Sequence, residues 1–165
     1  LRSDRAMSDP TLDFVTLAER PDLIVAVRSW LAGRHASPAA PERCFVLLAG
    51  GIPAGTASLT ARGLASRPDL TPWLANLFVP PALRGRGHAA RLVARVEAAA
   101  WVARIPALWL VTRSARGLYA RLGWQEIGPA DYYGEPAILM RRDRRPAREE
   151  TLQNPKPYTA ESAAT

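Results

Sequence analysis

The stretch from Asn76 to Val102 reads NLFVPPALRGRGHAARLVARVEAAAWV and carries the most information in the chain. Its first four residues are mostly apolar and end at Pro80, which is typical of a strand, because proline cannot donate a hydrogen bond to a sheet. Beyond the glycines, apolar residues recur at helical spacing on one face, with Arg91, Arg95 and Glu97 left for water. That apolar face comprises Ala89, Leu92, Val93, Val96 and Ala100.

The turn between the strand and the helix contains Arg84, Gly85, Arg86 and Gly87. The first amides of a helix have no intrahelical acceptor and carry positive potential, so a glycine turn that opens into a helix can hold an anion. The sequence therefore predicts a phosphate or pyrophosphate site. It lacks the Lys-Ser/Thr pair of a Walker loop, and alanine stands at position 90, where a dinucleotide fingerprint needs glycine.

Arg84, Gly87 and Ala89 form the pattern Arg-x-x-Gly-x-Ala after a Leu-x-Val strand end. This pattern resembles the acyl-CoA signature of the GNAT N-acetyltransferase superfamily, Gln/Arg-x-x-Gly-x-Gly/Ala. Taken alone, a solvated basic loop followed by a helix is the alternative interpretation.

A second pattern lies further along the chain. Ala115, Tyr119 and the pair Gly123-Trp124 have the spacing of another GNAT signature, in which a tyrosine lies four residues after an alanine and four before a glycine-aromatic pair. A tyrosine on an amphipathic helix is more often a packed core residue. Both signatures in the family's order favour the resemblance.

The apolar patterns of the whole chain predict a mixed α/β (α+β) fold. Helices are expected to begin at Pro21, to run over 90–102 and to follow Ser114, a potential capping residue. The strands on either side of the central helix should form a parallel pair, within a sheet that is otherwise mostly antiparallel. The expected strands are 13–17, 44–49, 54–60, 73–79, 107–111, 125–132 and 137–141.

The resemblance implies a GNAT-like fold whose strands splay around an acyl-CoA site. In the family an amine attacks the thioester of acetyl-CoA directly, and Tyr119 would protonate the departing thiolate. Thr112 stands where the family often has an asparagine that contacts CoA. The donor-binding residues that the resemblance implies are Leu77, Phe78, Val79, Arg84, Gly85, Arg86, Gly87, His88, Ala89, Ala90 and Thr112.

The general base is a departure from the family. Many members carry a glutamate before the Leu-x-Val segment, and this chain has Ala75 and Asn76 there. Asn76 can orient water but cannot usefully accept a proton. Asp69 and Glu135 are then the candidates, unless the amine arrives neutral, and His88 is expected at the surface.

The acceptor is expected to be a small-molecule or peptide amine. The residues expected to contact it are Trp73, Asn76, Tyr133 and Glu135, with core packing as the alternative role for the tryptophan.

Length and composition fit one globular domain. The 165 residues are 48% hydrophobic and 22% charged, and no apolar run is long enough to span a membrane. We expect a disordered N-terminus at 1–9, the acetyltransferase domain at 10–141 and a charged, disordered tail at 142–165. Cys44, the single cysteine, is expected to be a buried thiol. We expect a cytoplasmic location and no bound metal.

Three interpretations compete at this point. The first is an acetyl-CoA-dependent N-acetyltransferase, which could be a homodimer by family analogy. The second is a non-catalytic acyl-CoA-binding regulatory module, for which the missing glutamate is the argument. The third is a basic nucleic-acid-binding domain, which the net charge of +7 favours and no motif supports.

Overall fold

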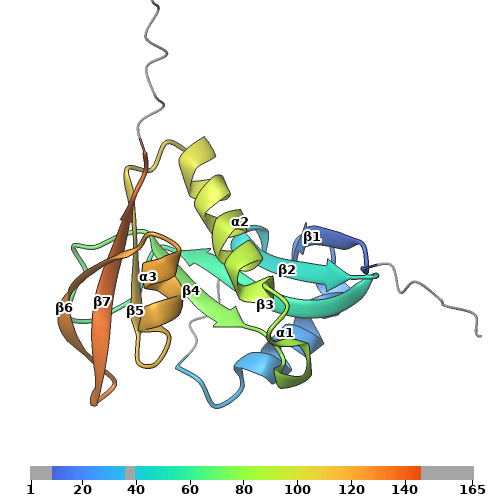
Figure 1. Ribbon diagram of the computed structural model, residues 1–165, viewed down its shortest axis with the longest axis horizontal. Coiled ribbons are helices and arrows are strands. Elements are labelled where there is room, and N and C mark those ends of the chain that lie inside the picture. Colours follow the sequence, from blue (N-terminus) through green and yellow to red (C-terminus); the bar gives the residue numbers. More distant parts are fainter. Residues whose placement is uncertain (1–8, 36–39, 146–165) are drawn as a thin grey trace, which may run out of the picture.

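A computed structural model describes residues 9–35 and 40–145, and in it seven strands form one sheet in the order β1-β2-β3-β4-β5-β7-β6 (Figure 1). Neighbouring strands are antiparallel except β4 and β5, which are parallel. This confirms the expected mixed α/β fold with a mostly antiparallel sheet. The strands are β1 (Leu12–Thr16), β2 (Cys44–Ala49), β3 (Ile52–Thr60), β4 (Trp73–Phe78), β5 (Ala107–Thr112), β6 (Gln125–Tyr132) and β7 (Glu135–Asp143).

The helices cover both faces of the sheet. Figure 1 shows α2 (His88–Val102) and α3 (Arg116–Arg121) in front of the sheet, and α1 (Ile24–Leu31) follows a 3-10 turn, η1 (Pro21–Leu23). Two further 3-10 turns, η2 (Pro41–Arg43) and η3 (Pro81–Leu83), lead into β2 and toward α2. No helix in the described ranges is long and apolar enough to cross a membrane.

Successive side chains of β2 point to opposite faces of the sheet and pack in two separate layers of the core. Phe45 and Leu47 pack with the buried side chains of α2, such as Leu92. Cys44, Val46 and Leu48 pack with α1. The period of two along a strand produces this division, since successive side chains point to opposite faces. Cys44 is buried, as expected.

The terminal hairpin differs from the expectation in its turn. Tyr133 and Gly134 both have left-handed backbone angles, with φ of 53° and 81°. Two such residues make the tight turn whose twist matches the flanking strands. β7 therefore starts at Glu135 and not at Ala137, and it continues to Asp143, two residues past the expected domain end. The expected tail beyond residue 145 and the N-terminus before residue 9 lie outside the described residues.

Two local predictions on the helices were wrong. Ser114 does not cap α3; its N-cap is Ala115, whose amide donates a hydrogen bond of 3.0 Å to Oγ1 of Thr112. Glu97 does not face water, because its side chain is only 14% exposed and accepts a hydrogen bond from the indole of Trp124.

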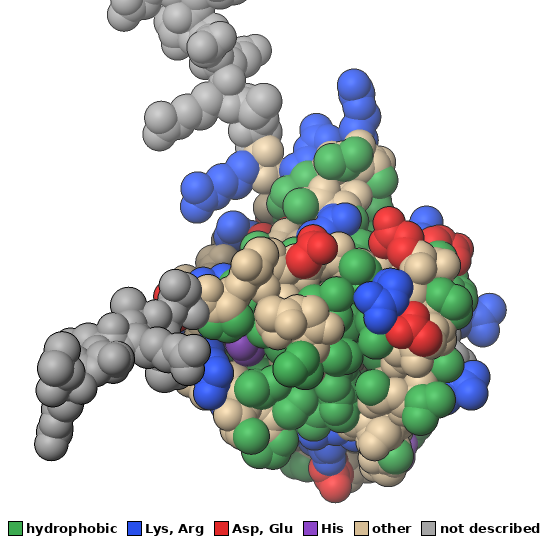
Figure 2. Space-filling model, turned by 90° about the vertical axis from the view of Figure 1, so that its right-hand side faces the viewer, with side chains coloured by type: hydrophobic (Ala, Val, Ile, Leu, Met, Phe, Trp, Pro, Cys, Tyr) green, Lys and Arg blue, Asp and Glu red, His purple; other side chains and the backbone are tan. Residues whose placement is uncertain are grey.

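Figure 2 views the molecule from the right-hand side of Figure 1. Hydrophobic side chains gather in the middle of this face, and both basic and acidic side chains lie around them. Basic charge therefore does not form a continuous surface here of the kind that nucleic-acid binding needs.

Candidate active site

β4 and β5 are joined at one point and open a cleft beyond it. Trp73 opposite Trp109 is the single register pair between the two strands. The cleft has a volume of about 270 Å³. Its lining comes from β4, β5, the start of α3, the end of α1 and the tip of β6, and comprises Leu31, Arg34, His35, Leu74, Ala75, Asn76, Leu77, Leu110, Val111, Thr112, Arg113, Ser114, Ala115, Tyr119 and Tyr132.

A bulge interrupts β4 where it borders the cleft. The register between β3 and β4 shifts between Thr56 and Ser58, opposite the segment that contains Asn76. Asn76 has φ of 57°, which is left-handed. Asparagine tolerates this conformation better than most residues, whereas a glutamate would be strained there. The residue type at position 76 thus suits the backbone as well as the cleft wall.

The predicted anion site lies in the connection from β4 to α2. Gly85 and Gly87 have φ of 78° and 79°, a conformation that favours glycine, and both are exposed. The first helical hydrogen bond runs from the Arg91 amide to the Gly87 carbonyl at 3.2 Å. The amides before Arg91 therefore have no intrahelical acceptor.

Two arginine side chains form hydrogen bonds with the backbone of this turn. Nε of Arg84 donates a hydrogen bond of 2.9 Å to the carbonyl of Val79, and Nη1 of Arg91 donates one of 2.8 Å to the carbonyl of Arg86. The guanidinium groups thus hold the backbone of the turn while they add positive charge beside it.

His88 is not a surface residue, which corrects the expectation. Its side chain is only 5% exposed, and Nδ1 has no hydrogen-bond partner among the described residues. Burial lowers the pKa of the imidazole, and the charges of Arg91 and Arg86 lower it further. The ring is therefore neutral at neutral pH, and the backbone amide is the part of His88 that the anion site can use.

Tyr119 enters the cleft from α3. It is 6% exposed and packs edge-to-face on Trp124, with ring centroids 6.0 Å apart. Burial raises the pKa of the phenol well above its ordinary value, so the hydroxyl keeps its proton at neutral pH. No described residue forms a hydrogen bond with this hydroxyl. It is therefore available to donate to a group bound in the cleft.

Arg34 and His35, on the opposite side of the cleft, were not predicted from the sequence. Oη of Tyr132 donates a hydrogen bond of 2.9 Å to the carbonyl of His35, and the His35 ring stacks on Tyr133 with centroids 3.8 Å apart. Arg34 places its guanidinium 4.6 Å from the centroid of Phe78. No local signal identified Arg34 or His35, because their contacts join segments far apart in the sequence.

Residues 40–126 match the family model described as the acetyltransferase (GNAT) domain, which is more than half of the chain. The chain belongs to the GNAT acetyltransferase family. It is therefore a transferase of the acyltransferase class. No curated protein matches the chain.

Solved structures of GNAT proteins share the fold. The ribosomal-protein-S18-alanine N-acetyltransferase of Escherichia coli is 23% identical with a TM-score of 0.61, over 85% of this chain and 98% of that one. Ard1 of Thermoplasma volcanium is 14% identical with a TM-score of 0.64, and the match covers 80% of this chain and 97% of that one. The N-acetylglutamate synthase of Neisseria gonorrhoeae, complexed with coenzyme A and L-arginine, is 19% identical with a TM-score of 0.61. This chain, matched over 82% of its length, spans only 34% of that synthase.

Three of the residues predicted for donor binding or catalysis line the cleft, and the residues of the glycine turn lie outside its lining. The three are Leu77, Thr112 and Tyr119, and Phe78 lies partly buried beneath Arg34 and Arg84. Val79 is buried at the end of the strand. The hydroxyl oxygen of Thr112 accepts a hydrogen bond from the Ala115 amide, so the hydroxyl can still donate its own hydrogen to a ligand.

Several residues predicted for the acceptor or the base lie elsewhere. Trp73 is 1% exposed, and its indole nitrogen donates a hydrogen bond of 2.7 Å to the carbonyl of Leu70. This tryptophan therefore packs in the core and does not line the cleft. Glu135 does not line the cleft, although it forms an ion pair with the lining residue Arg113.

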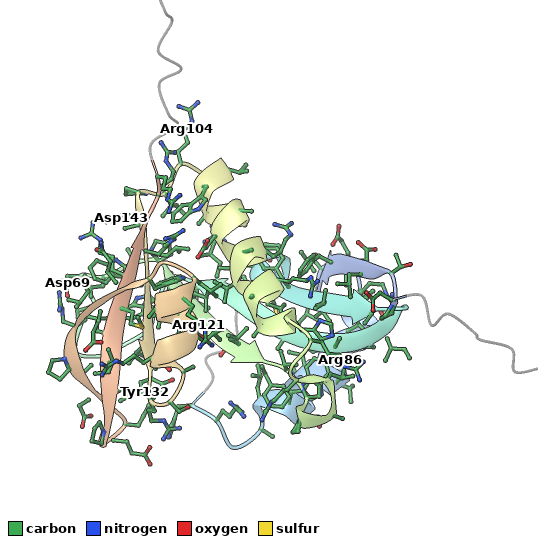
Figure 3. The ribbon with its side chains drawn as sticks, viewed as in Figure 1. Asp69, Arg86, Arg104, Arg121, Tyr132 and Asp143 are labelled. Atoms are coloured by element: carbon green, nitrogen blue, oxygen red, sulfur yellow. The ribbon has the colours of Figure 1, made fainter. Side chains whose placement is uncertain are left out.

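Asp69 and Tyr133 also lie outside the lining. Asp69 pairs with Arg67 at 2.9 Å, and that hydrogen bond lowers the pKa of the carboxyl. Figure 3 shows Asp69 on the left, on the opposite side of the molecule from Arg86. Tyr133 is 65% exposed and stacks on His35, which does line the cleft. Of these predicted acceptor-side residues, only Asn76 contributes to the cleft wall.

Proposed function

We propose that this protein is an acetyl-CoA-dependent N-acetyltransferase that transfers the acetyl group directly to the amine of a small molecule or peptide. The observation that carries the proposal is the cleft between β4 and β5, which holds the protonated hydroxyl of Tyr119. The glycine turn lies after η3 in the connection from β4 to α2, outside the cleft lining, so the donor is proposed to extend from this turn along β4 into the cleft.

The donor fits these two features. The amides of residues 85–90 hold the pyrophosphate, with positive charge from Arg84 and Arg86. The backbone of residues 77–79 pairs with the pantetheine arm like an added strand. The Thr112 hydroxyl gives the arm a further hydrogen bond. That the N-acetylglutamate synthase structure contains coenzyme A supports this donor class.

The chemistry is a direct displacement on the thioester. The amine nitrogen attacks the carbonyl carbon, the C–N bond forms and the C–S bond breaks. A strand amide at Phe78 or Val79 stabilises the oxyanion of the tetrahedral intermediate. The sulfur leaves with a proton from Tyr119, and solvent returns that proton to the tyrosine.

His35 is the proposed acceptor of the proton that the amine loses. The titratable side chains of the lining are Arg34, His35, Arg113, Tyr119 and Tyr132, with no carboxylate among the described residues. Imidazole is the side-chain type in this set that most often serves as a general base. His35 is therefore proposed for this role, since neither Asp69 nor Glu135 lines the cleft and each is paired with an arginine.

The absence of a carboxylate from the described lining also keeps the second interpretation open, a regulatory module that binds acyl-CoA without turnover. Calorimetric titration with acetyl-CoA, followed by thiol release with a panel of amines, separates the two. Binding with amine-dependent thiol release supports the enzyme. Binding without release supports the regulatory module, and failure to bind acetyl-CoA overturns both.

A further inference from the structure

We infer that the acceptor is a compact amine that also carries a carboxylate, as an amino acid does, and that Arg34 binds this carboxylate. The inference rests on the proposed function and names the substrate class of the same cleft. Four observations support it: the charge of the lining, the position of Arg34, its lack of a carboxylate partner among the described residues, and the contacts that bound the cleft.

The charge of the cleft is positive. Its described lining contains Arg34, His35 and Arg113 and no acidic side chain. Arg113 already has a partner, because it forms an ion pair with Glu135. Arg34 has no carboxylate partner among the described residues. An acceptor with several ammonium groups would therefore be repelled, and an anionic group would be attracted.

Arg34 is held on the acceptor side of the sheet. Trp30 of α1 contacts Phe78 with ring centroids 5.9 Å apart, and Trp30 packs with the α1 layer of the core. Arg34 rests on the same phenylalanine ring. Tyr119 reaches the cleft from the opposite layer, which contains α2 and α3. The two faces of the cleft thus present a hydrogen-bond donor for the thiolate and a cation for the acceptor.

Among the described residues, Arg34 makes a ring contact and no ion pair. Its Cζ lies over the ring of Phe78, 4.6 Å from the ring centroid. The N–H groups of a guanidinium lie in its plane, so a contact on the face does not consume them. A planar carboxylate can then accept two parallel hydrogen bonds from the edge.

The acceptor side is bounded by contacts between distant segments. Tyr132 bonds to the His35 carbonyl and Tyr133 stacks on its ring, which ties the β6–β7 hairpin to the segment after α1. The cleft of about 270 Å³ must also hold the acetyl end of the donor. The tie between the hairpin and the segment after α1 limits the room beside the donor, which favours an acceptor of amino-acid size over an extended peptide.

The test compares acceptors that differ only in the carboxylate. Each standard amino acid is assayed for thiol release beside its amide and its decarboxylated amine, with short peptides and polyamines as further arms. We expect kcat/KM for the best amino acid to exceed that for its amide by at least about tenfold, although the amide has the less basic amine. Equal rates, or a preference for amides, peptides or polyamines, would overturn the inference.

The variant Arg34→Gln tests the assigned residue. We expect KM for the carboxylated acceptor to rise about tenfold or more, while KM for the amide and the affinity for acetyl-CoA stay unchanged. Arg28→Gln is the matched control, since Arg28 is exposed on α1 and does not line the cleft. Weaker acetyl-CoA binding by Arg34→Gln would instead assign Arg34 to the donor and overturn the inference.

A different experimental result would overturn the proposed function. If the protein does not bind acetyl-CoA in calorimetry, the acetyltransferase proposal itself is wrong. If it binds acetyl-CoA but transfers to none of the carboxylated acceptors, only the substrate class is wrong.

Discussion

The hydroxyl of Tyr132 donates a hydrogen bond of 2.9 Å to the carbonyl oxygen of His35, 97 residues earlier in the chain. This bond joins the last hairpin of the sheet to the segment that follows α1. Both residues line the same cleft. The acceptor side of the cleft is therefore shaped by a long-range contact and not by any local motif.

Removing this bond should loosen acceptor binding selectively. A net hydrogen bond is worth about 1 kcal/mol, so Tyr132→Phe should raise acceptor KM about fivefold. The dissociation constant for acetyl-CoA should not change, because the donor site lies at the other side. Steady-state kinetics with calorimetry checks this, and an unchanged acceptor KM would show that the bond has no role in acceptor binding.

Tyr119→Phe should lower kcat roughly a hundredfold, the size of a general acid contribution, with acetyl-CoA affinity near normal. The hydroxyl has no described hydrogen-bond partner, so its removal leaves no buried group unpaired and should not reduce the free energy of unfolding. Thiol-release kinetics and denaturant unfolding measure the two effects. If kcat stays the same, Tyr119 serves only in packing.

Gly87→Ala should weaken acetyl-CoA binding about tenfold or more. A side chain in the left-handed region is disfavoured by roughly 1–2 kcal/mol, and a Cβ here would lie 3.0 Å from Nη1 of Arg91. Gly51→Ala is the control, because Gly51 has the same φ of 79° in the β2–β3 turn, away from the anion site. Calorimetry should show normal binding for Gly51→Ala, and equal losses in both variants would contradict the assignment.

Trp124→Phe should destabilise the fold in a pH-dependent way. The indole nitrogen donates a hydrogen bond of 2.9 Å to Oε1 of Glu97. Loss of a hydrogen bond to a charged, partly buried group costs about 1–3 kcal/mol of stability. Burial raises the pKa of Glu97, while Arg142 and Trp124 oppose that shift. Without the indole donor, the folded-state pKa should rise further.

The direction of this pH dependence of stability follows from the number of protons that the folded and unfolded states bind. Between the ordinary carboxyl pKa and the raised one, the folded state holds a proton that the unfolded state has lost, so stability falls as pH rises. The loss in Trp124→Phe should therefore be larger at neutral than at mildly acidic pH. Denaturant unfolding at both pH values checks this. Trp101→Phe is the control, since Trp101 packs on the same core and its indole has no described hydrogen-bond partner; an equal pH dependence there would contradict the role of Glu97.

The glycine turn before α2 and the place of Tyr119 on a helix were predictable because both are local. The glycine turn that opens α2 and the tyrosine of α3 each belong to a single short segment, and glycine and helix spacing fix where their backbones go. The acceptor side depends on which segments meet after folding. Arg34, His35 and Tyr132 meet through tertiary packing, and the burial of His88 and Trp73 depends on neighbours distant in sequence.

The single pairing of Trp73 with Trp109 gives the sheet two inner edges. Unpaired strand edges normally invite another strand, which is why proteins protect them at the periphery. Here the open edges face each other across a gap within one molecule, where a second protein strand has little access and a single extended ligand arm can pair. Under the proposed function, strand edges that would be an aggregation hazard on the outside of the molecule instead select a slender ligand.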